Sequence, residues 1–214
     1  INLRVRPDGS IYVSAPLRTP QESIESFLIA REKWILRALE RVTDRTDAYP
    51  DLPVLAQRDS VPYLGGSLRV QYAACNSRKG RWSLDEPAGL LRVELPDPTS
   101  DSWRIGALQS FEKQRTQELV QEYLRQYLPL FAERGVAAPA AVRFRIMQSR
   151  WGSCSGRTHS LSFNARLCER PHAFIEYVVV HELCHFLHGN HSADFWREVE
   201  RYLPDWQARR KLGD

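Results

Sequence analysis

The segment VVVHELCHFLHGNHSADFW constrains this 214-residue chain more than any other, because it holds four of the six histidines. Within it, the pattern H-E-x-x-H begins at His181 and ends at His185. Four residues advance a helix by about 400°, so the two imidazoles lie on one face, with Glu182 beside them. The preceding residues are mostly apolar and predict a buried helix. Two histidines and a carboxylate in such a helix need a partner, and a Zn²⁺ ion suits them.

A catalytic zinc takes a third protein ligand and leaves its fourth position to water. His188 lies on the same helical face, but about 7–8 Å further along the axis than an ion held by the pair, and an imidazole cannot bend back that far. His191 follows Gly189-Asn190, which suits a left-handed turn that ends the helix. We therefore expect His181, His185 and His191 to bind the metal, and His188 to lie at the rim, within reach of a substrate.

Several alternatives stay open at this site. Glu198 or Glu200 could supply the third ligand from the next helix, and imidazoles also suit Ni²⁺, Co²⁺ or Fe²⁺. Cys184 points elsewhere on the helix, so we expect it to pack rather than bind the ion. Asp194 is a candidate acceptor for the second N–H of a ligating imidazole.

The chemistry that this pattern predicts is hydrolysis. A zinc ion lowers the pKa of bound water to about 7, and Glu182 can act as the general base that takes the proton from that water. The same machinery attacks amide, ester or phosphoryl centres. The motif thus predicts a hydrolase better than it predicts the bond that is cleaved.

The rest of the chain predicts an α+β protein in two parts. Residues 1–98 contain short alternating segments around Asp8-Gly9 and a capping box over 19–22 that opens a helix to about Arg41, followed by a small antiparallel sheet. We expect residues 99–214 to form the catalytic domain.

The second part begins with a long helical pattern that runs to about Gly135 and that we expect Pro129 to break. Two strands follow, joined by a turn over 151–159, and Pro171 opens the motif helix. Ser192 is expected to cap a further helix, whose core residues brace the loop that carries His191. Those core residues are Phe195, Trp196, Val199, Tyr202 and Leu203.

The composition indicates the cellular location of the protein and the partners that it can bind. Hydrophobic residues make up 43% of the chain, but no apolar run approaches the roughly 20 residues that span a bilayer. Charges near the start do not suit a signal peptide, and the four cysteines show no C-x-x-C spacing. We therefore expect reduced thiols, a cytoplasmic location and no membrane contact. The net charge of +4 is small, so nucleic-acid binding is not expected.

The segments QSRWGSCSGRTHSLSFNARL and IEYVVVHELCHFLHGNHSADFW closely resemble the YgjP-like metallopeptidases, relatives of the SprT-like and WLM groups within the zincins. The segments DGSIYVSAP, FLIAREKWI and VPYLGGSLRV also resemble landmarks of that family. The resemblance implies a zincin-like fold with an N-terminal β-rich extension. It also implies an H-E-x-x-H-x5-H zinc site, with the third ligand at His191. The resemblance leaves the substrate open, and we expect a peptide or a protein.

The resemblance also suggests residues beside the metal. In zincin-like folds the strand before the active helix borders the cleft, which here implies residues 159–165, with Asn164 and Ala165 nearest the ion; a plain sheet strand is the alternative. In the turn that we expect around Gly152, Arg150 or Ser153 could bind an anionic or carbonyl group. Trp151 is expected to pack under the motif helix.

Two other functions remain as hypotheses. A metal-dependent phosphoanhydride hydrolase could hold a nucleotide through Arg150, Arg166 and the basic stretch RKGR at 78–81. A binding or scaffold module, associated with nucleic acid or protein, is the second. Glu182 argues against that module, because scaffolding needs no general base.

Overall fold

The computed structural model describes residues 1–5, 11–32, 34–36, 38 and 58–213, which form two compact units, Ile1–Leu55 and Ala56–Asp214. The first unit contains an antiparallel pair of strands and a helix: β1 (Asn2–Val5), β2 (Ile11–Ser14) and α1 (Gln21–Ala30). The predicted turn at Asp8-Gly9 and most of the predicted helix beyond residue 36 lie outside the described residues. The boundary that we expect after residue 98 falls within the second unit, between two of its elements, and it stays a prediction.

The predicted capping box at the start of α1 is wrong. The helix begins one residue later than that box requires, so Pro20 is the N-cap and its ring offers no side-chain acceptor. The backbone carbonyl of Pro20 instead accepts hydrogen bonds from the N–H groups of Ser23 and Ile24, at 3.1 and 3.3 Å.

The second unit opens with a four-stranded sheet in the order β3-β4-β6-β5. Its strands are β3 (Ser60–Tyr63), β4 (Gly66–Ala74), β5 (Arg81–Asp85) and β6 (Leu90–Leu95). The prediction of an antiparallel sheet is wrong in one pairing, because β4 and β6 run parallel. The reason lies in β6, whose Leu91, Val93 and Leu95 are fully buried. The most apolar strand takes the central position, and β5 turns back along its outer side.

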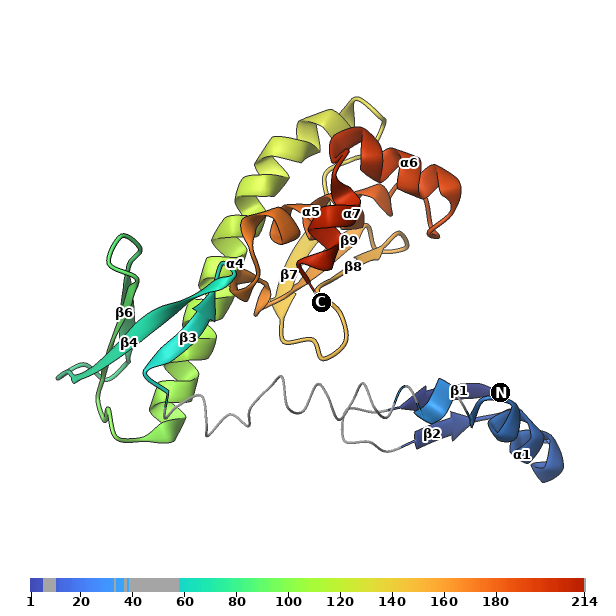
Figure 1. Cartoon of the computed structure of the whole chain (residues 1–214), viewed down its shortest axis with the longest axis horizontal. Helices are drawn as coiled ribbons and strands as arrows, with labels where there is room; N and C mark the ends of the chain where they lie inside the picture. Colours follow the sequence, from blue (N-terminus) through green and yellow to red (C-terminus); the bar gives the residue numbers. More distant parts are fainter. Residues whose placement is uncertain (6–10, 33, 37, 39–57, 214) are drawn as a thin grey trace. The chain divides into compact units, whose positions relative to one another are not determined.

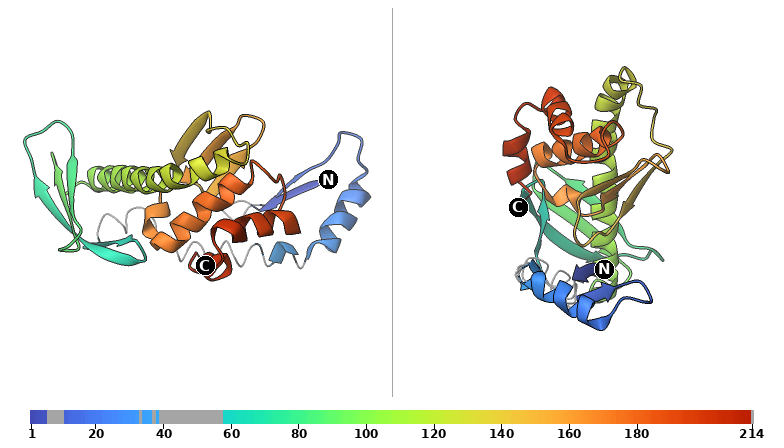
Figure 2. Two further views of the ribbon diagram at one scale, coloured as in Figure 1. Left: turned by 90° about the horizontal axis from the view of Figure 1, so that it is seen from above. Right: turned by 90° about the vertical axis from the view of Figure 1, so that its right-hand side faces the viewer.

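Helix α4 (Asp101–Ala132) connects this sheet to the rest of the unit, as Figures 1 and 2 show. The sheet lies against its N-terminal part, and the later helices lie along its C-terminal part. Pro129 does not break the helix as predicted, because it stands in the last turn, where few further backbone hydrogen bonds remain to be lost. The helix ends at Ala132, near the predicted end at Gly135, and the left-handed φ of +80° at Gly135 lets the N–H of Val136 bond back to the carbonyl of Phe131.

A three-stranded sheet and three helices complete the unit. The sheet has the order β7-β9-β8, with β7 (Ala141–Arg145), β8 (Gly152–Ser155) and β9 (Ser160–Asn164). A short 3-10 helix, η1 (Leu167–Glu169), precedes α5 (His172–Cys184), α6 (Ala193–Tyr202) and α7 (Trp206–Lys211). The predicted turn over 151–159 is therefore wrong in its first half, which forms β8; the residues that turn are 156–159.

One hydrophobic core runs through the second unit and places α5 at its centre. Nine of the thirteen residues of α5 are buried, and the core cluster includes side chains of both sheets and of α4. All four cysteines are free thiols. Within the described residues, no helix has both the length and the apolar character needed to cross a membrane. The predicted α+β fold class is confirmed.

Candidate metal centre

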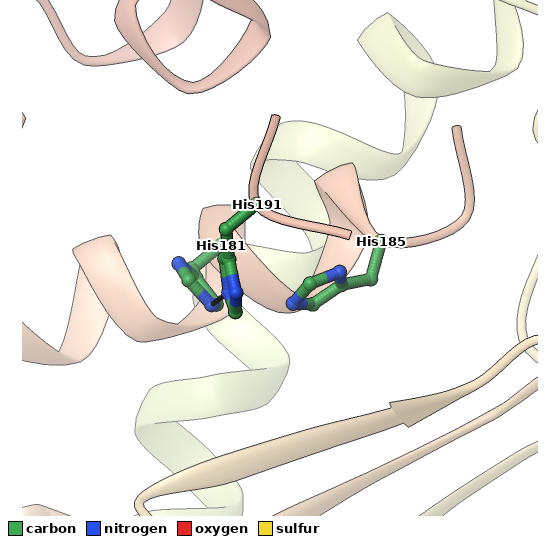
Figure 3. A group of neighbouring side chains, drawn as sticks. All are labelled: His181, His185 and His191. Atoms are coloured by element: carbon green, nitrogen blue, oxygen red, sulfur yellow. Dashed lines mark hydrogen bonds between the residues drawn. The ribbon is translucent and has the colours of Figure 1, made fainter. Parts of the chain in front are cut away.

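Three histidines converge where α5 ends. His181 lies in the last turn of α5 and His185 is its C-cap residue, so their spacing places both rings on one side of the helix. His191 approaches from the segment before α6, and one ring nitrogen from each of the three lies within 4.8 Å of the others. Figure 3 shows the rings directed toward one another. His181 and His185 are half-buried, whereas His191 is exposed.

The chain reverses after α5 by a tight turn. The N–H groups of Leu187 and His188 both bond to the carbonyl of Cys184, at 3.0 Å. Neither Gly189 nor Asn190 has a left-handed φ, so the left-handed turn predicted there is wrong. Backbone hydrogen bonds to the last carbonyls of α5 instead extend its final turn to His188, and the chain bends at Gly189 and Asn190 without a left-handed residue.

His188 serves the site through its backbone. Its carbonyl oxygen lies 3.1 Å from Nδ1 of His185. A carbonyl can only accept, so Nδ1 of His185 carries the proton and Nε2 keeps its lone pair for a metal. The side chain of His188 is half-buried and lies outside the converging group, as the sequence predicts.

His181 is held in its neutral form. Burial, together with the neighbouring His185 and His191, lowers the pKa of His181 to about 3. Its Nδ1 lies 3.3 Å from the hydroxyl of Tyr177, one helical turn earlier, and its Nε2 lies 3.0 Å from Nε2 of His191. Burial also lowers the pKa of His185. Both helical imidazoles therefore offer lone pairs at neutral pH, as metal ligands must.

These donors suit a zinc ion. Tetrahedral zinc with bonds of about 2.0–2.1 Å to imidazole nitrogen sets the ligand nitrogens about 3.3 Å apart, close to the 3.0 Å between the Nε2 atoms of His181 and His191. Within the described residues, no carboxylate or thiol belongs to the converging group. Three imidazoles match the set typical of catalytic zinc and leave a fourth position open.

Glu182 follows His181 on α5, and its side chain packs against β8. Only 6% of its surface is exposed, and burial raises its pKa to about 8, against the lowering effects of Arg150 and of a hydrogen bond from the backbone N–H of Cys154. A Cβ atom at Gly152 would lie 2.6 Å from Cγ and 2.7 Å from Oε1 of Glu182. The close approach of Glu182, and not a turn, is therefore what requires glycine at 152.

The outer edge of strand β8 lies beside Glu182, which accepts a hydrogen bond from the N–H of Cys154 on that edge. The carbonyl of Trp151 accepts a hydrogen bond from the N–H of Asn164 at 2.9 Å, so alternation along an antiparallel pair directs the backbone groups of Gly152 and Cys154 away from β9. Among the described strands, none pairs with that outer edge of β8.

The strand that carries Asn164 is less accessible than the sequence analysis expects. β9 is the central strand of its sheet, and Asn164 and Ala165 are only 2% and 4% exposed. The Asn164 amide donates to the carbonyls of Met147 and Arg150, at 2.7 and 3.1 Å. Its side chain therefore fixes the loop before β8, and the free edge that could border a cleft belongs to β8.

The other residues of the RWGSC segment divide as expected. Trp151 packs edge-on against Phe174 of α5, with ring centroids 6.0 Å apart, which confirms its predicted place under the motif helix. Arg150 is exposed and lies close enough to Glu182 to lower its pKa. Ser153 is half-buried and pairs with Ser162 of β9.

The alternative ligands lie elsewhere. Glu198 is buried and its carboxylate meets Arg134 at 3.3 Å, which ties α6 to the end of α4. Glu200 is exposed and Cys184 is buried, and neither belongs to the converging group. Asp194 forms an ion pair with Arg197, so its predicted role as a partner of a ligand is not supported.

The start of α6 forms the apolar floor of the site. Ser192 caps the helix by accepting a hydrogen bond from the N–H of Phe195, as predicted. The fully buried ring of Phe195 lies 4.9, 4.6 and 4.8 Å from the ring centroids of His181, His185 and His191. Sequence reasoning expected Phe195 in the core but missed its contact with all three histidines. It also missed Tyr177, although the four-residue spacing from His181 signals a shared helical face.

Comparison with known proteins identifies the family. The model of the YgjP-like metallopeptidase domain matches residues 1–212. Among solved structures, the metallopeptidase zymogen abylysin of Pyrococcus abyssi is 21% identical, with a TM-score of 0.35 over 45% of this chain and 87% of that one. No curated protein matches the chain. The family match spans nearly the whole sequence, including the converging histidines and Glu182, and the chain therefore belongs to the YgjP-like metallopeptidases.

Proposed function

We propose that the chain is a zinc-dependent peptidase, with His181, His185 and His191 as the metal ligands and Glu182 as the general base. The observation that carries the proposal is the convergence of three imidazole nitrogens within 4.8 Å beside a buried carboxyl group. Zn²⁺ bound there would lower the pKa of a water molecule to about 7 and polarise the carbonyl of the bond under attack.

Glu182 supplies the proton transfers. Its carboxylate takes the proton of the attacking water and returns it to the amine that leaves. The N–H of Cys154 holds the carboxylate in place, and a cation beside it favours the ionised form that a base needs. The raised pKa of Glu182, about 8 without a metal, suits the second step, in which the same group acts as an acid.

The outer edge of β8 is our proposed binding surface for the substrate. An extended peptide can pair with the backbone groups of Gly152 and the carbonyl of Cys154 as an added strand, which aligns one carbonyl with the metal centre. Arg150 stands exposed beside Glu182 and can bind a carbonyl or an acidic side chain of that peptide. His188 remains a candidate contact at the rim.

The positions of the arginines disfavour a nucleotide substrate. Arg166 is mostly buried and lies 2.5 Å from Glu169, so it is engaged within the fold. The stretch 78–81 lies in the other sheet, at the end of the connection between β4 and β5, and Arg81, the first residue of β5, pairs with Glu94. Of the three groups that could hold phosphates, only Arg150 lies beside the site.

Metal content tests the ligand set. Protein purified without chelator should contain about one zinc per chain by elemental analysis. His191→Ala should lose most of it, whereas His188→Ala, which keeps the backbone carbonyl used by His185, should retain it. An equal zinc content in wild type and His191→Ala would move the third ligand elsewhere, and absence of zinc after its addition would refute the metal site.

Hydrolysis tests the reaction. A panel of unstructured peptides should be cleaved by the zinc-loaded protein, and Glu182→Gln should reduce the rate by about 10²–10⁴-fold while zinc content is unchanged. Cleavage of nucleotide phosphoanhydrides in place of peptides would favour the rival hydrolase. Peptide cleavage that survives Glu182→Gln would refute the role of Glu182.

A further inference from the structure

The third histidine is the least supported of the three converging side chains. His181 and His185 are half-buried and belong to α5, whereas His191 is exposed and precedes α6 in a segment without regular structure. An exposed imidazole in such a segment has several rotamers available, and only one directs Nε2 at the other two rings. A well-formed site therefore needs another group to select that rotamer.

A stack of aromatic rings lies behind His191. The indole of Trp196 is nearly parallel to the imidazole of His191, with centroids 5.5 Å apart and planes inclined by 21°. Trp206 of α7 stacks in turn on Trp196, with centroids 4.2 Å apart and planes inclined by 14°. The imidazole is thus the last ring of a three-ring column that begins on the C-terminal helix.

The far end of this column is fixed to the body of the unit. Arg209 of α7 donates to Glu176 of α5, and the same carboxylate accepts a hydrogen bond of 2.6 Å from the hydroxyl of Tyr127 on α4. The guanidinium of Arg210 also lies 5.7 Å from the ring of Trp196. Helix α7 therefore holds Trp206 in a position set by two longer helices.

We propose that Trp196 is a positioning residue that sets the rotamer of His191, and that Trp206 supports it, so that α7 contributes to metal affinity without touching the ion. The inference rests on the proposed metal site. It assigns a purpose to two half-buried tryptophans that the proposed reaction does not use. Groups that orient a ligand in this way commonly change metal affinity by about 10–100-fold.

Trp196 suits a test better than its neighbour Phe195. Phe195 is fully buried against all three imidazoles, so its removal would disturb the fold and the ligands together. Trp196 is half-buried and, of the three histidines, stacks only on His191, although its ring also lies 5.9 Å from that of His181 at a tilt of 55°. Its replacement keeps all three ligand side chains. Trp82 of β5, in the other sheet, offers a matched control. It is also half-buried, and it packs edge-on against Phe111 of α4.

The experiment compares wild type with Trp196→Leu, Trp196→Phe, Trp206→Leu and Trp82→Leu. Zinc dissociation constants are measured by competition with a chromophoric chelator, and the unfolding of the metal-free proteins is followed by circular dichroism. Visible absorption of the Co²⁺-loaded proteins reports the coordination geometry. These readouts separate a loosened ligand from a merely weakened fold.

We expect Trp196→Leu to weaken zinc binding by about 10–100-fold and to alter the Co²⁺ spectrum. Trp196→Phe, which keeps an aromatic face, should recover most of the affinity, and Trp206→Leu should give a smaller loss. Trp82→Leu should lower the unfolding temperature without changing zinc affinity.

Wild-type affinity in a folded Trp196→Leu, or an equal loss of affinity in Trp82→Leu, would overturn the proposed role. If Trp196→Leu does not fold, Trp206→Leu decides, because it removes the support and keeps the His191–Trp196 contact; unchanged affinity there would overturn the proposal. Absence of zinc binding in wild type would refute the metal site itself, whereas equal binding in all variants would refute only the role of the ring column.

Discussion

At the scale of single residues, the geometry around the general base depends on a missing side chain. Gly152 lies in β8, and the carboxyl group of Glu182 fills the space that a Cβ atom would need, with Cγ only 2.6 Å from that point. The φ angle of Gly152 is not left-handed, so its backbone alone does not require glycine. The requirement comes from the neighbour across the gap.

We therefore expect Gly152→Ala to displace Glu182 while leaving the histidines in place. The added methyl group would meet Oε1 at 2.7 Å, and a misplacement of about 1 Å in a reacting group can lower a rate about 100-fold. Zinc content should stay at the wild-type level, and peptide hydrolysis should fall by roughly that factor. Gly156→Ala is the matched control, because a Cβ atom there meets nothing within 4 Å. Equal activity in both variants would contradict the contact.

The sequence could predict the converging histidines because their geometry follows from helical spacing. His181 and His185 are four residues apart on one apolar helix, and His191 needs only a chain reversal after it. The sequence could not predict why Gly152 is glycine, because that reason is a contact between residues thirty positions apart. The stacking of Trp196 on His191 likewise depends on where α6 and α7 pack.

At the scale of secondary-structure elements, the turn between β3 and β4 connects the larger sheet to the start of α5. The N–H groups of Leu64 and Gly65 bond to the carbonyls of Cys168 and Glu169 in η1, both at 2.9 Å. Gly65 also approaches Pro171, the N-cap of α5, so closely that a Cβ atom would lie 2.6 Å from its Cγ. This contact helps to fix where the motif helix begins.

The effect of this contact on stability can be measured by comparing alanine substitutions at two glycines with the same φ angle. Gly65 and Gly135 both have a φ of +80°, so alanine at either position costs about 1–2 kcal/mol of backbone strain. A Cβ atom at Gly135 meets nothing within 4 Å. We therefore expect Gly65→Ala to lose about 1–3 kcal/mol more unfolding free energy than Gly135→Ala in urea titrations, because of overpacking against Pro171. Equal losses of unfolding free energy in the two variants would show that the turn between β3 and β4 is not tightly packed against Pro171.

Strands were predicted less well where their position or their formation depends on the neighbouring strand. The sequence indicates the strands of the larger sheet, but local alternation carries no information on whether β4 meets β5 or β6. β6 takes the central position because its apolar side chains are the most completely buried. β8 was missed because GSCS has small polar residues, and its strand conformation comes from pairing with the apolar β9. In both cases the packing of distant segments, and not the local sequence, determines the structure.

At the scale of the whole unit, buried carboxyl groups join α4 to the segment before the motif helix. Glu112 of α4 is 8% exposed, and Glu169 of η1 is 9% exposed. Arg166 lies 2.5 Å from Glu169 and 4.0 Å from Glu112. Burial and the charge of Glu169 together raise the pKa of Glu112 to about 7, although Arg166 lowers it. Arg166 thus interacts with both buried carboxyl groups, and Arg170 also lowers the pKa of Glu169.

This arrangement predicts a pH dependence of stability. The pKa of Glu112 is about 7 in the folded protein and 4.5 by its ordinary value, so between these pH values the folded protein retains a proton that the unfolded chain releases. Its contribution to stability is present below about pH 4.5 and is lost as the pH rises through 7. Glu112→Gln cannot ionise and therefore escapes this loss.

We expect Glu112→Gln to gain about 2 kcal/mol relative to wild type between pH 5 and pH 8. Unfolding free energies from urea titrations of the chelator-treated proteins, measured at both pH values, give that difference. The histidines titrate alike in both proteins, so their contributions cancel. Glu122→Gln, an exposed glutamate of the same helix, should show no such trend. A variant-minus-wild-type difference that stays constant from pH 5 to pH 8 would mean that Glu112 is ionised throughout, and that Arg166 compensates both carboxylates.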